Sequence, residues 1–104
     1  MSDAAQSYRK AAIQNVLGPK GFAAQTDRKA AFANDGVPEG ARALIDKVTK
    51  NAWKVTDEDV AGAKAAGVTE DQVFELSVCA AMGQSTRQLD AAMAALDAAI
   101  EEKK

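Results

Sequence analysis

Few side chains in this sequence could do chemistry, and their types exclude most reaction classes. The 104-residue chain has one cysteine, Cys79, and no histidine. A Ser-His-Asp hydrolase cannot be built from it, and a metal site would need oxygen ligands, for which no EF-hand spacing is found. The glycines of residues 18–21 (GPKG) lack the Walker spacing and form no phosphate loop. We therefore assign no catalytic residue, no metal ligand and no cofactor.

The lone thiol allows a redox or nucleophilic role, but its neighbours argue against one. Glu75 lies one helical turn before Cys79 in the expected last helix. A carboxylate at that distance disfavours the thiolate, which is the reactive form. Free cysteines are also among the most often buried residues. We predict that Cys79 is a packing residue, and a single cysteine fits a reducing compartment because it cannot form an intrachain disulfide.

Three other residues are candidates for binding a ligand: Trp53, Glu75 and Arg87. Trp53, the only tryptophan, is expected to anchor the core or an interface, with ligand stacking as the alternative. Arg87 continues an apolar face of the last helix, so it is either an interface ion pair or an anion clamp in a pocket. Glu75 could be its partner across an interface, since twelve residues separate them on one helix. The acidic run 57–59 is interpreted as helix-dipole compensation, because consecutive helical residues point in different directions.

The elements that position these residues are expected to be helices in a single domain spanning residues 1–104. Strand alternation is almost absent, so the fold class is all-α with about five helices. Capping and breaking signals place these helices at residues 4–17, 27–33, 38–52, 56–66 and 70–101. Thr26, Thr56 and Thr69 are the expected N-caps, and Gln72 completes a capping box with Thr69. Gly67 is the expected stop between the last two helices.

The last helix carries a stripe that indicates association. Leu89, Met93, Leu96 and Ile100 are spaced 4, 3 and 4 residues apart, as in a heptad seam. Aromatic residues are only 5% of the chain, so an alanine-rich core buries little area and leaves a deficit that an oligomer interface could supply. Gly83 interrupts this helix either as a kink or as a point of close helix contact. We expect a homo-oligomer.

Charge and hydropathy restrict the partners. The chain has 13 basic and 15 acidic residues, and its basic residues are scattered among acids, so nucleic acid is not an expected partner. No apolar run is long enough to span a membrane, and no secretory signal is found at the N-terminus. We expect a cytoplasmic protein that binds neither nucleic acid nor membrane.

Two segments of the sequence resemble segments of a known protein family. AKAAGVTEDQVFEL at residues 63–76, followed by an alanine-rich helix and RQLDAA at residues 87–92, resembles the alkylhydroperoxidase D-like family, which belongs with the carboxymuconolactone decarboxylases. The resemblance covers about residues 38–98 and leaves an N-terminal helical segment, 1–36, outside it. It implies an all-helical domain whose last two helices form the packed core motif, and assembly into trimers or hexamers.

The chemistry of that family is missing from this chain. The resemblance implies a C-x-x-C-x-x-x-H helix, and counting back from Gly67 places its thiols at Ala52 and Val55 and its histidine at Asp59. Alanine and valine are not nucleophiles, and a carboxylate raises the pKa of a nearby thiol. Peroxidase and disulfide-reductase activities are therefore expected to be absent.

Three functions remain open at this point. The first is a non-peroxidase, oligomeric module that binds a small molecule or is structural. The second is a thiol-independent decarboxylase or isomerase in which Glu75 and Asp59 act on a small anionic substrate held by Arg87. The third is a plain protein-interaction bundle without a ligand pocket. A pocket that joins Trp53, Glu75 and Arg87 would distinguish the third from the others.

Overall fold

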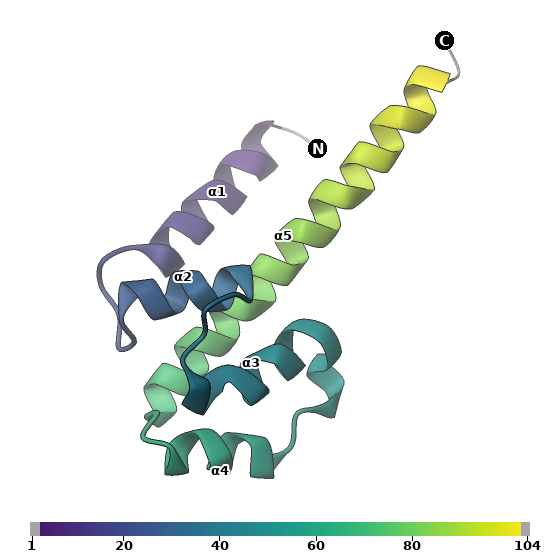
Figure 1. Ribbon diagram of the computed structural model, residues 1–104. Coiled ribbons are helices and arrows are strands. Elements are labelled where there is room, and N and C mark those ends of the chain that lie inside the picture. Colours follow the sequence, from purple (N-terminus) through teal and green to yellow (C-terminus); the bar gives the residue numbers. More distant parts are fainter. Residues whose placement is uncertain (1–2, 103–104) are drawn as a thin grey trace.

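The computed structural model describes residues 3–102, which form helices joined by short loops (Figure 1). The elements are α1 (Asp3–Leu17), α2 (Gln25–Ala33), α3 (Glu39–Asn51), the 3-10 helix η1 (Ala52–Lys54), α4 (Asp57–Ala65) and α5 (Glu70–Glu102). No strand occurs among these residues. The expected all-α class with about five helices is confirmed.

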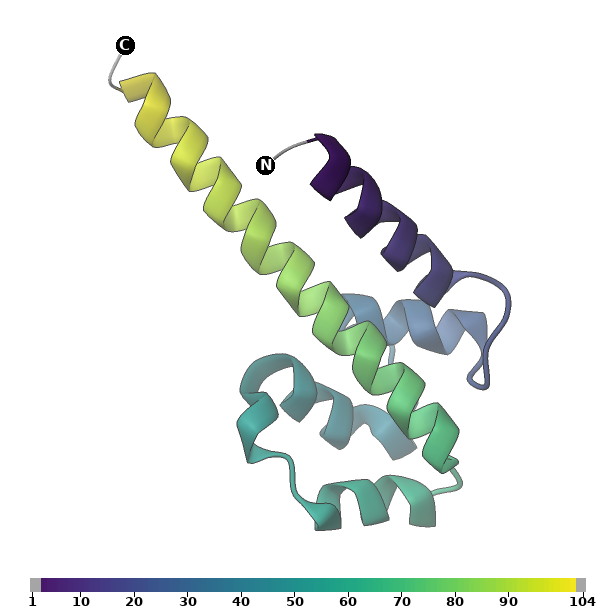
Figure 2. The same ribbon diagram turned by 180° about the vertical axis from the view of Figure 1, so that it is seen from behind.

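Helix α5 is the spine of the molecule (Figures 1 and 2). Helices α2 and α3 pack against its N-terminal half, α4 closes that end, and α1 runs along it in the opposite chain direction. The main core cluster joins α2, α3 and α5 through small and aliphatic side chains, including Ala31, Ala41, Ile45, Leu76, Cys79 and Ala80. Only Ala63 of α4 is buried. The resemblance implied a core made by the last two helices. Here α5 supplies the largest share of the buried apolar residues, α3 the next largest, and α2 and α4 one each.

Local signals determine most helix ends. The backbone N–H of Asp59 donates to Oγ1 of Thr56 at 3.3 Å, and the N–H of Thr56 donates to Oδ2 of Asp59 at 2.9 Å. Thr69 and Gln72 make the same reciprocal pair at the start of α5. Gly67 has a φ of +98°, a value that favours glycine and ends α4. These predicted caps and this stop are confirmed.

The predicted cap of α2 is wrong. Helix α2 begins at Gln25, its N-cap is Ala24 without a side-chain hydrogen bond, and Thr26 lies inside the helix. Instead, Nε2 of Gln25 donates to the backbone oxygen of Leu17 at 2.8 Å. The first turn of α2 is thus positioned by its contact with the end of α1, which no local capping rule predicts.

Gly83 is a point of close helix contact and does not break α5, which is continuous through it. The carbonyl group of Phe32, in the last turn of α2, lies against the backbone of Gly83. A β-carbon at position 83 would lie 2.7 Å from the carbonyl carbon of Phe32 and 2.9 Å from its Cα. One turn later, Nη1 of Arg87 donates to the backbone oxygen of Phe32. Arg87 therefore caps the C-terminal end of α2.

The heptad-spaced stripe is divided between two environments. Leu89 is half-buried in a cavity that α1 and α5 share, whereas Leu96 and Ile100 are 51% and 48% exposed. Every residue from 94 to 102 is exposed. Helix α1 therefore covers the beginning of the stripe and leaves its end unpartnered within the chain. Within residues 3–102, none of the helices has the length and apolar character needed to cross a membrane.

Candidate functional site

The three candidate ligand-binding residues do not form one site. Trp53 lies in η1 and is exposed, so a role as a core anchor is wrong and an interface role stays a prediction. Arg87 binds the backbone oxygen of Phe32 and the side chain of Gln84. Glu75 lies two turns into α5, and none of the described cavities is lined by more than one of the three candidates.

Glu75 binds the loop that joins α1 to α2. The backbone N–H groups of Phe22 and Ala23 donate to its carboxylate oxygens at 2.6 and 2.9 Å. Nε of Arg28 lies 3.7 Å from Oε1 of the same carboxylate. Partial burial raises the pKa of Glu75, but the two hydrogen bonds and the Arg28 charge outweigh it, so the pKa is below its ordinary value. Glu75 is ionised at neutral pH and is a poor general acid.

Arg28 is the ion-pair partner of Glu75, and the sequence did not indicate it. Its side chain is only 2% exposed, and it donates from Nε to the backbone oxygen of Ala23 at 3.0 Å and from Nη1 to that of Val16 at 2.7 Å. These bonds secure the last turn of α1 and the following loop. Gly21 makes room for this arrangement, since a β-carbon there would lie 2.8 Å from Oε1 of Glu75. Forty-seven residues separate Arg28 from Glu75, so no local spacing could have paired them.

A cavity of about 210 Å³ opens beside this pair. Its lining combines charged, amide and apolar side chains: Asn15, Val16, Lys20, Arg28, Phe74, Glu75 and Val78. The lining brings together the end of α1, the following loop, α2 and α5. It is the only cavity described among residues 3–102 that is lined by one of the sequence candidates. Chemically it offers hydrogen-bond donors, two cationic side chains and one carboxylate beside an apolar wall.

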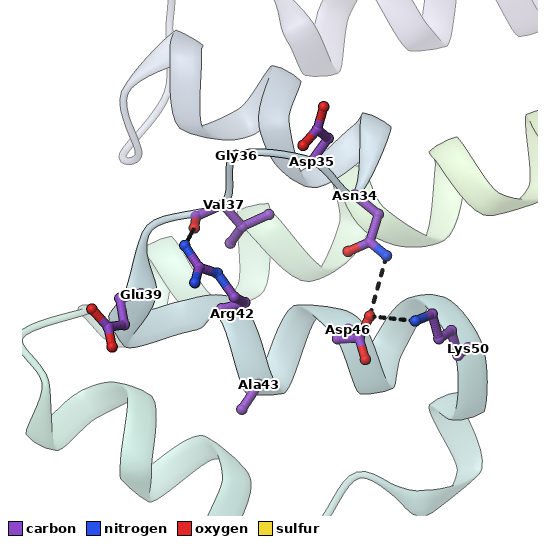
Figure 3. A pocket seen from close by; sticks show the side chains of 9 residues that line it. All are labelled: Asn34, Asp35, Gly36, Val37, Glu39, Arg42, Ala43, Asp46 and Lys50. Carbon is purple, nitrogen blue, oxygen red and sulfur yellow. Dashed lines mark hydrogen bonds and ion pairs between the residues drawn. The ribbon is translucent and has the colours of Figure 1, made fainter.

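A larger hollow, of about 780 Å³, lies between the α2–α3 turn and the outer side of α3 (Figure 3). Asp46 accepts from Nδ2 of Asn34 at 3.3 Å and pairs with Nζ of Lys50 at 3.1 Å, as the dashed lines of Figure 3 show. Nη2 of Arg42 donates to the backbone oxygen of Val37. The hydrogen bond from Lys50, with that from Asn34, lowers the pKa of Asp46. This hollow is open, and among its charged lining residues Asp46 and Lys50 form an ion pair with each other.

A third cavity, of about 240 Å³, lies between α1 and α5 and is lined mainly by apolar side chains. It contains Arg9, whose Nε and Nη1 are buried without a hydrogen-bond partner among the described residues. Nη2 of Arg9 lies 3.8 Å from Oδ1 of Asp90, which is too long for a hydrogen bond. The cavity therefore contains a charged side chain with two unsatisfied hydrogen-bond donors next to apolar surface.

The positions that the family resemblance would give to thiol chemistry do not share a helix. Ala52 lies in η1, Val55 is extended, and Asp59 lies in the first turn of α4. The carboxylate of Asp59 accepts hydrogen bonds from Lys47 and Thr56, which hold its pKa below the ordinary value. General acid–base catalysis by a carboxylate at neutral pH needs a raised pKa. The pKa values of Asp59 and Glu75 are both lowered, so neither carboxylate fits this role.

Cys79 is completely buried in the main core cluster. Burial raises the pKa of its thiol; the Arg28 charge opposes this rise and the Glu75 charge adds to it. Its predicted packing role is confirmed. Within residues 3–102, no three side chains of His, Cys, Asp or Glu gather in a group that could hold a metal ion.

No protein-family model matches this sequence, and neither the curated proteins nor the solved structures contain a significant match to it. The family assignment therefore stays a prediction that depends on residues 63–76 and 87–92.

Proposed function

We propose that the protein is a non-peroxidase helical module of the alkylhydroperoxidase D-like type that self-associates through α1 and the C-terminal half of α5. The observation that carries this proposal is the unpartnered end of the heptad-spaced stripe, where Leu96 and Ile100 remain about half exposed. A helix with an apolar stripe at this spacing packs on another helix, and α1 is too short to cover it all.

The shape of the chain supports a partner. Its radius of gyration is 15.9 Å, against about 13 Å for a compact domain of this size. Its accessible surface is 6931 Å², whereas a compact monomer of 10.9 kDa exposes roughly 5,600 Å². The excess, about 1,300 Å², exceeds the roughly 800 Å² that one protein contributes to a standard interface. A second subunit could therefore bury the surface that α5 leaves uncovered.

The aromatic side chains lie mostly on the surface. Tyr8, Phe22, Trp53 and Phe74 are each between 68% and 78% exposed, and Phe32 is the only one of the five aromatic residues that is not exposed. Aromatic residues are enriched at protein interfaces because they bury a large area at a low cost in side-chain entropy. This distribution favours an interaction module over an enzyme with an enclosed active site.

The occupant that we favour is a second copy of the chain. Residues 88–104 carry four acidic residues and two basic ones, Lys103 and Lys104, whereas α1 carries the exposed Lys10. A two-fold pairing of α1–α5 units brings the acidic end of each α5 toward the basic α1 of the other copy. Such an interface uses the same surface twice, as in most homodimers. A hexamer, one of the assemblies that the family resemblance implies, could repeat this two-fold contact, whereas a trimer would need a different, head-to-tail contact.

Sedimentation velocity on the full chain tests the assembly. We expect a defined oligomer that Leu96→Lys dissociates, because a lysine ammonium in the apolar contact is costly to desolvate. Ala98→Lys is the matched control: it adds the same charge on the opposite side of the same exposed helix segment and should leave the oligomer intact. A wild-type monomer at micromolar concentration contradicts the proposal, as does an equal response of the two variants.

The non-peroxidase part of the proposal has its own test. With Cys79 buried and no histidine in the chain, we expect no turnover of an alkyl hydroperoxide in the presence of a dithiol reductant. Turnover that is abolished in Cys79→Ala would contradict this expectation. The alternative of a carboxylate-based decarboxylase receives no support from the lowered pKa values of Glu75 and Asp59.

A further inference from the structure

We propose that the 210 Å³ cavity beside Arg28 and Glu75 binds a small carboxylate with a flat apolar body, such as an aromatic monocarboxylate. The cavity is a separate feature from the assembly face, so this inference goes beyond the proposed function. Its elements are a buried guanidinium, a lysine, an amide and an apolar wall in a single lining.

The guanidinium of Arg28 is held in place before any ligand arrives. Its Nε and Nη1 donate to the backbone oxygens of Ala23 and Val16, and Nη2 has no hydrogen-bond partner among the described residues. Because the side chain is 98% buried and still lines the cavity, it offers a ligand a donor that is already fixed in position. A donor fixed in this way costs little entropy when it binds, and a charge-assisted hydrogen bond is stronger than a neutral one.

The charges in the lining select a monoanion. Arg28 and Lys20 are cationic, and Glu75 is anionic because its pKa is below the ordinary value. One net positive charge remains, which one carboxylate neutralises. A phosphate dianion would bring a second negative charge close to Glu75, so it is disfavoured. The side-chain amide of Asn15 offers a further, neutral donor.

The apolar part of the lining selects the body of the ligand. Val16, Val78 and Phe74 line the cavity, and Phe74 is one of the exposed aromatic residues. A cavity of about 150 Å³ holds a benzene molecule, so 210 Å³ accommodates a ring and one carboxylate. A ligand ring placed against Phe74 would bury apolar surface on both partners and gain from aromatic contact.

The α1–α5 cavity is the weaker candidate for an anion site. The unpartnered Nε and Nη1 of Arg9 are themselves buried, so an anion could not reach them without a change in side-chain conformation. Arg28, in contrast, has its other donors satisfied and shares its cavity with an exposed lysine, Lys20. The geometry therefore favours the cavity beside Arg28.

The experiment is a titration of the isotope-labelled full chain with benzoate at fixed ionic strength, followed by amide chemical shifts. We expect saturable shifts centred on residues 15–28 and 74–78. Lys20→Gln should weaken binding by about three- to tenfold, as for the loss of one partly exposed charged hydrogen bond. Phe74→Ala should also weaken it. Both side chains are exposed, so neither change threatens the fold.

The controls distinguish specific binding of benzoate in this cavity from weak nonspecific binding elsewhere on the protein. Lys54→Gln removes an exposed lysine from η1 outside the cavity and should leave the benzoate affinity unchanged. Benzyl alcohol, which has the ring without the charge, and inorganic phosphate, which has charge without the ring, should each bind more weakly than benzoate. The proposal is overturned by no saturable shift with benzoate, by equal effects of Lys20→Gln and Lys54→Gln, or by benzyl alcohol or phosphate binding as tightly as benzoate.

Discussion

Gly83 lies directly against the backbone carbonyl group of Phe32, with no space for a β-carbon between α5 and the end of α2. The neighbouring atom is backbone, which cannot rotate away as a side chain could. Helices α2 and α5 therefore approach each other at this point only because position 83 lacks a side chain.

Gly83→Ala should destabilise the protein by about 2–3 kcal/mol, because the added methyl group must separate two packed helices. Gly62→Ala is the matched control: a β-carbon at position 62 in α4 meets nothing within 4 Å, so the higher helix propensity of alanine should stabilise by about 0.5–1 kcal/mol. Urea unfolding of both variants measures the difference. Equal effects of the two substitutions would mean that α2 and α5 are not in close contact.

Glu75 should make stability depend on pH in the acidic range. Folding lowers its pKa below the ordinary value of 4.5, so the unfolded chain takes up the proton first as the pH falls. The stabilisation from Glu75 is therefore complete above pH 4.5 and is lost as the pH falls through the lower folded-state pKa.

Glu75→Gln should cost about 1–3 kcal/mol at pH 7, because a charged acceptor of two backbone N–H groups is lost. The difference in unfolding free energy between wild type and variant should shrink below pH 4.5. Asp46 and Asp59 titrate in the same range, but they are present in both proteins and cancel in the difference. A difference that stays constant from pH 7 to pH 3 would contradict the role of Glu75.

Arg9→Met should stabilise the chain by about 1 kcal/mol. It removes two buried donors that lack partners and fills a cavity lined by Ile13, Met82 and Leu89 with an apolar side chain. The lost ion pair with Asp90 is long and partly exposed, so it contributes little. Lys54→Met, at an exposed position in η1 away from the assembly contact, should change thermal stability by less than about 0.5 kcal/mol. A clear loss of stability in Arg9→Met would show that Arg9 is satisfied in solution.

Cys79 should react with a chromogenic disulfide reagent at least about 100-fold more slowly in the folded than in the unfolded chain, because access requires opening of the core. Burial also raises the pKa of the thiol, which lowers the thiolate fraction at neutral pH. The control is the double variant Cys79→Ala with Ala98→Cys, whose exposed thiol should react as in a free peptide. Fast labelling of native wild-type protein would place Cys79 outside the core.

Features that depend on neighbours in sequence could be predicted, and those that depend on distant contacts could not. The caps at Thr56 and Thr69 involve residues three positions apart, so the sequence alone indicates them. The start of α2 could not be placed in this way, since Gln25 and Arg28 bind carbonyl oxygens at the end of α1.

The candidate site shows the same limit. The sequence indicates Glu75 as a ligand-binding candidate and Arg87 as its partner across an interface, because the two are too far apart on one helix to touch. The actual partner, Arg28, comes from α2. The sequence indicates Trp53 as an anchor of the core or of an interface, but only its contacts with distant residues decide between them. The structure places it in η1, where its side chain is 77% exposed.

Helix α1 is attached to the rest of the chain mainly at one end. None of residues 4–17 is fully buried, and the carbonyl oxygens of Val16 and Leu17 are held by Arg28 and Gln25. An element secured in this way opens from its free end without unfolding the remaining helices. The contacts of Arg28 thus define the boundary between a cooperative unit and a separately opening N-terminal arm.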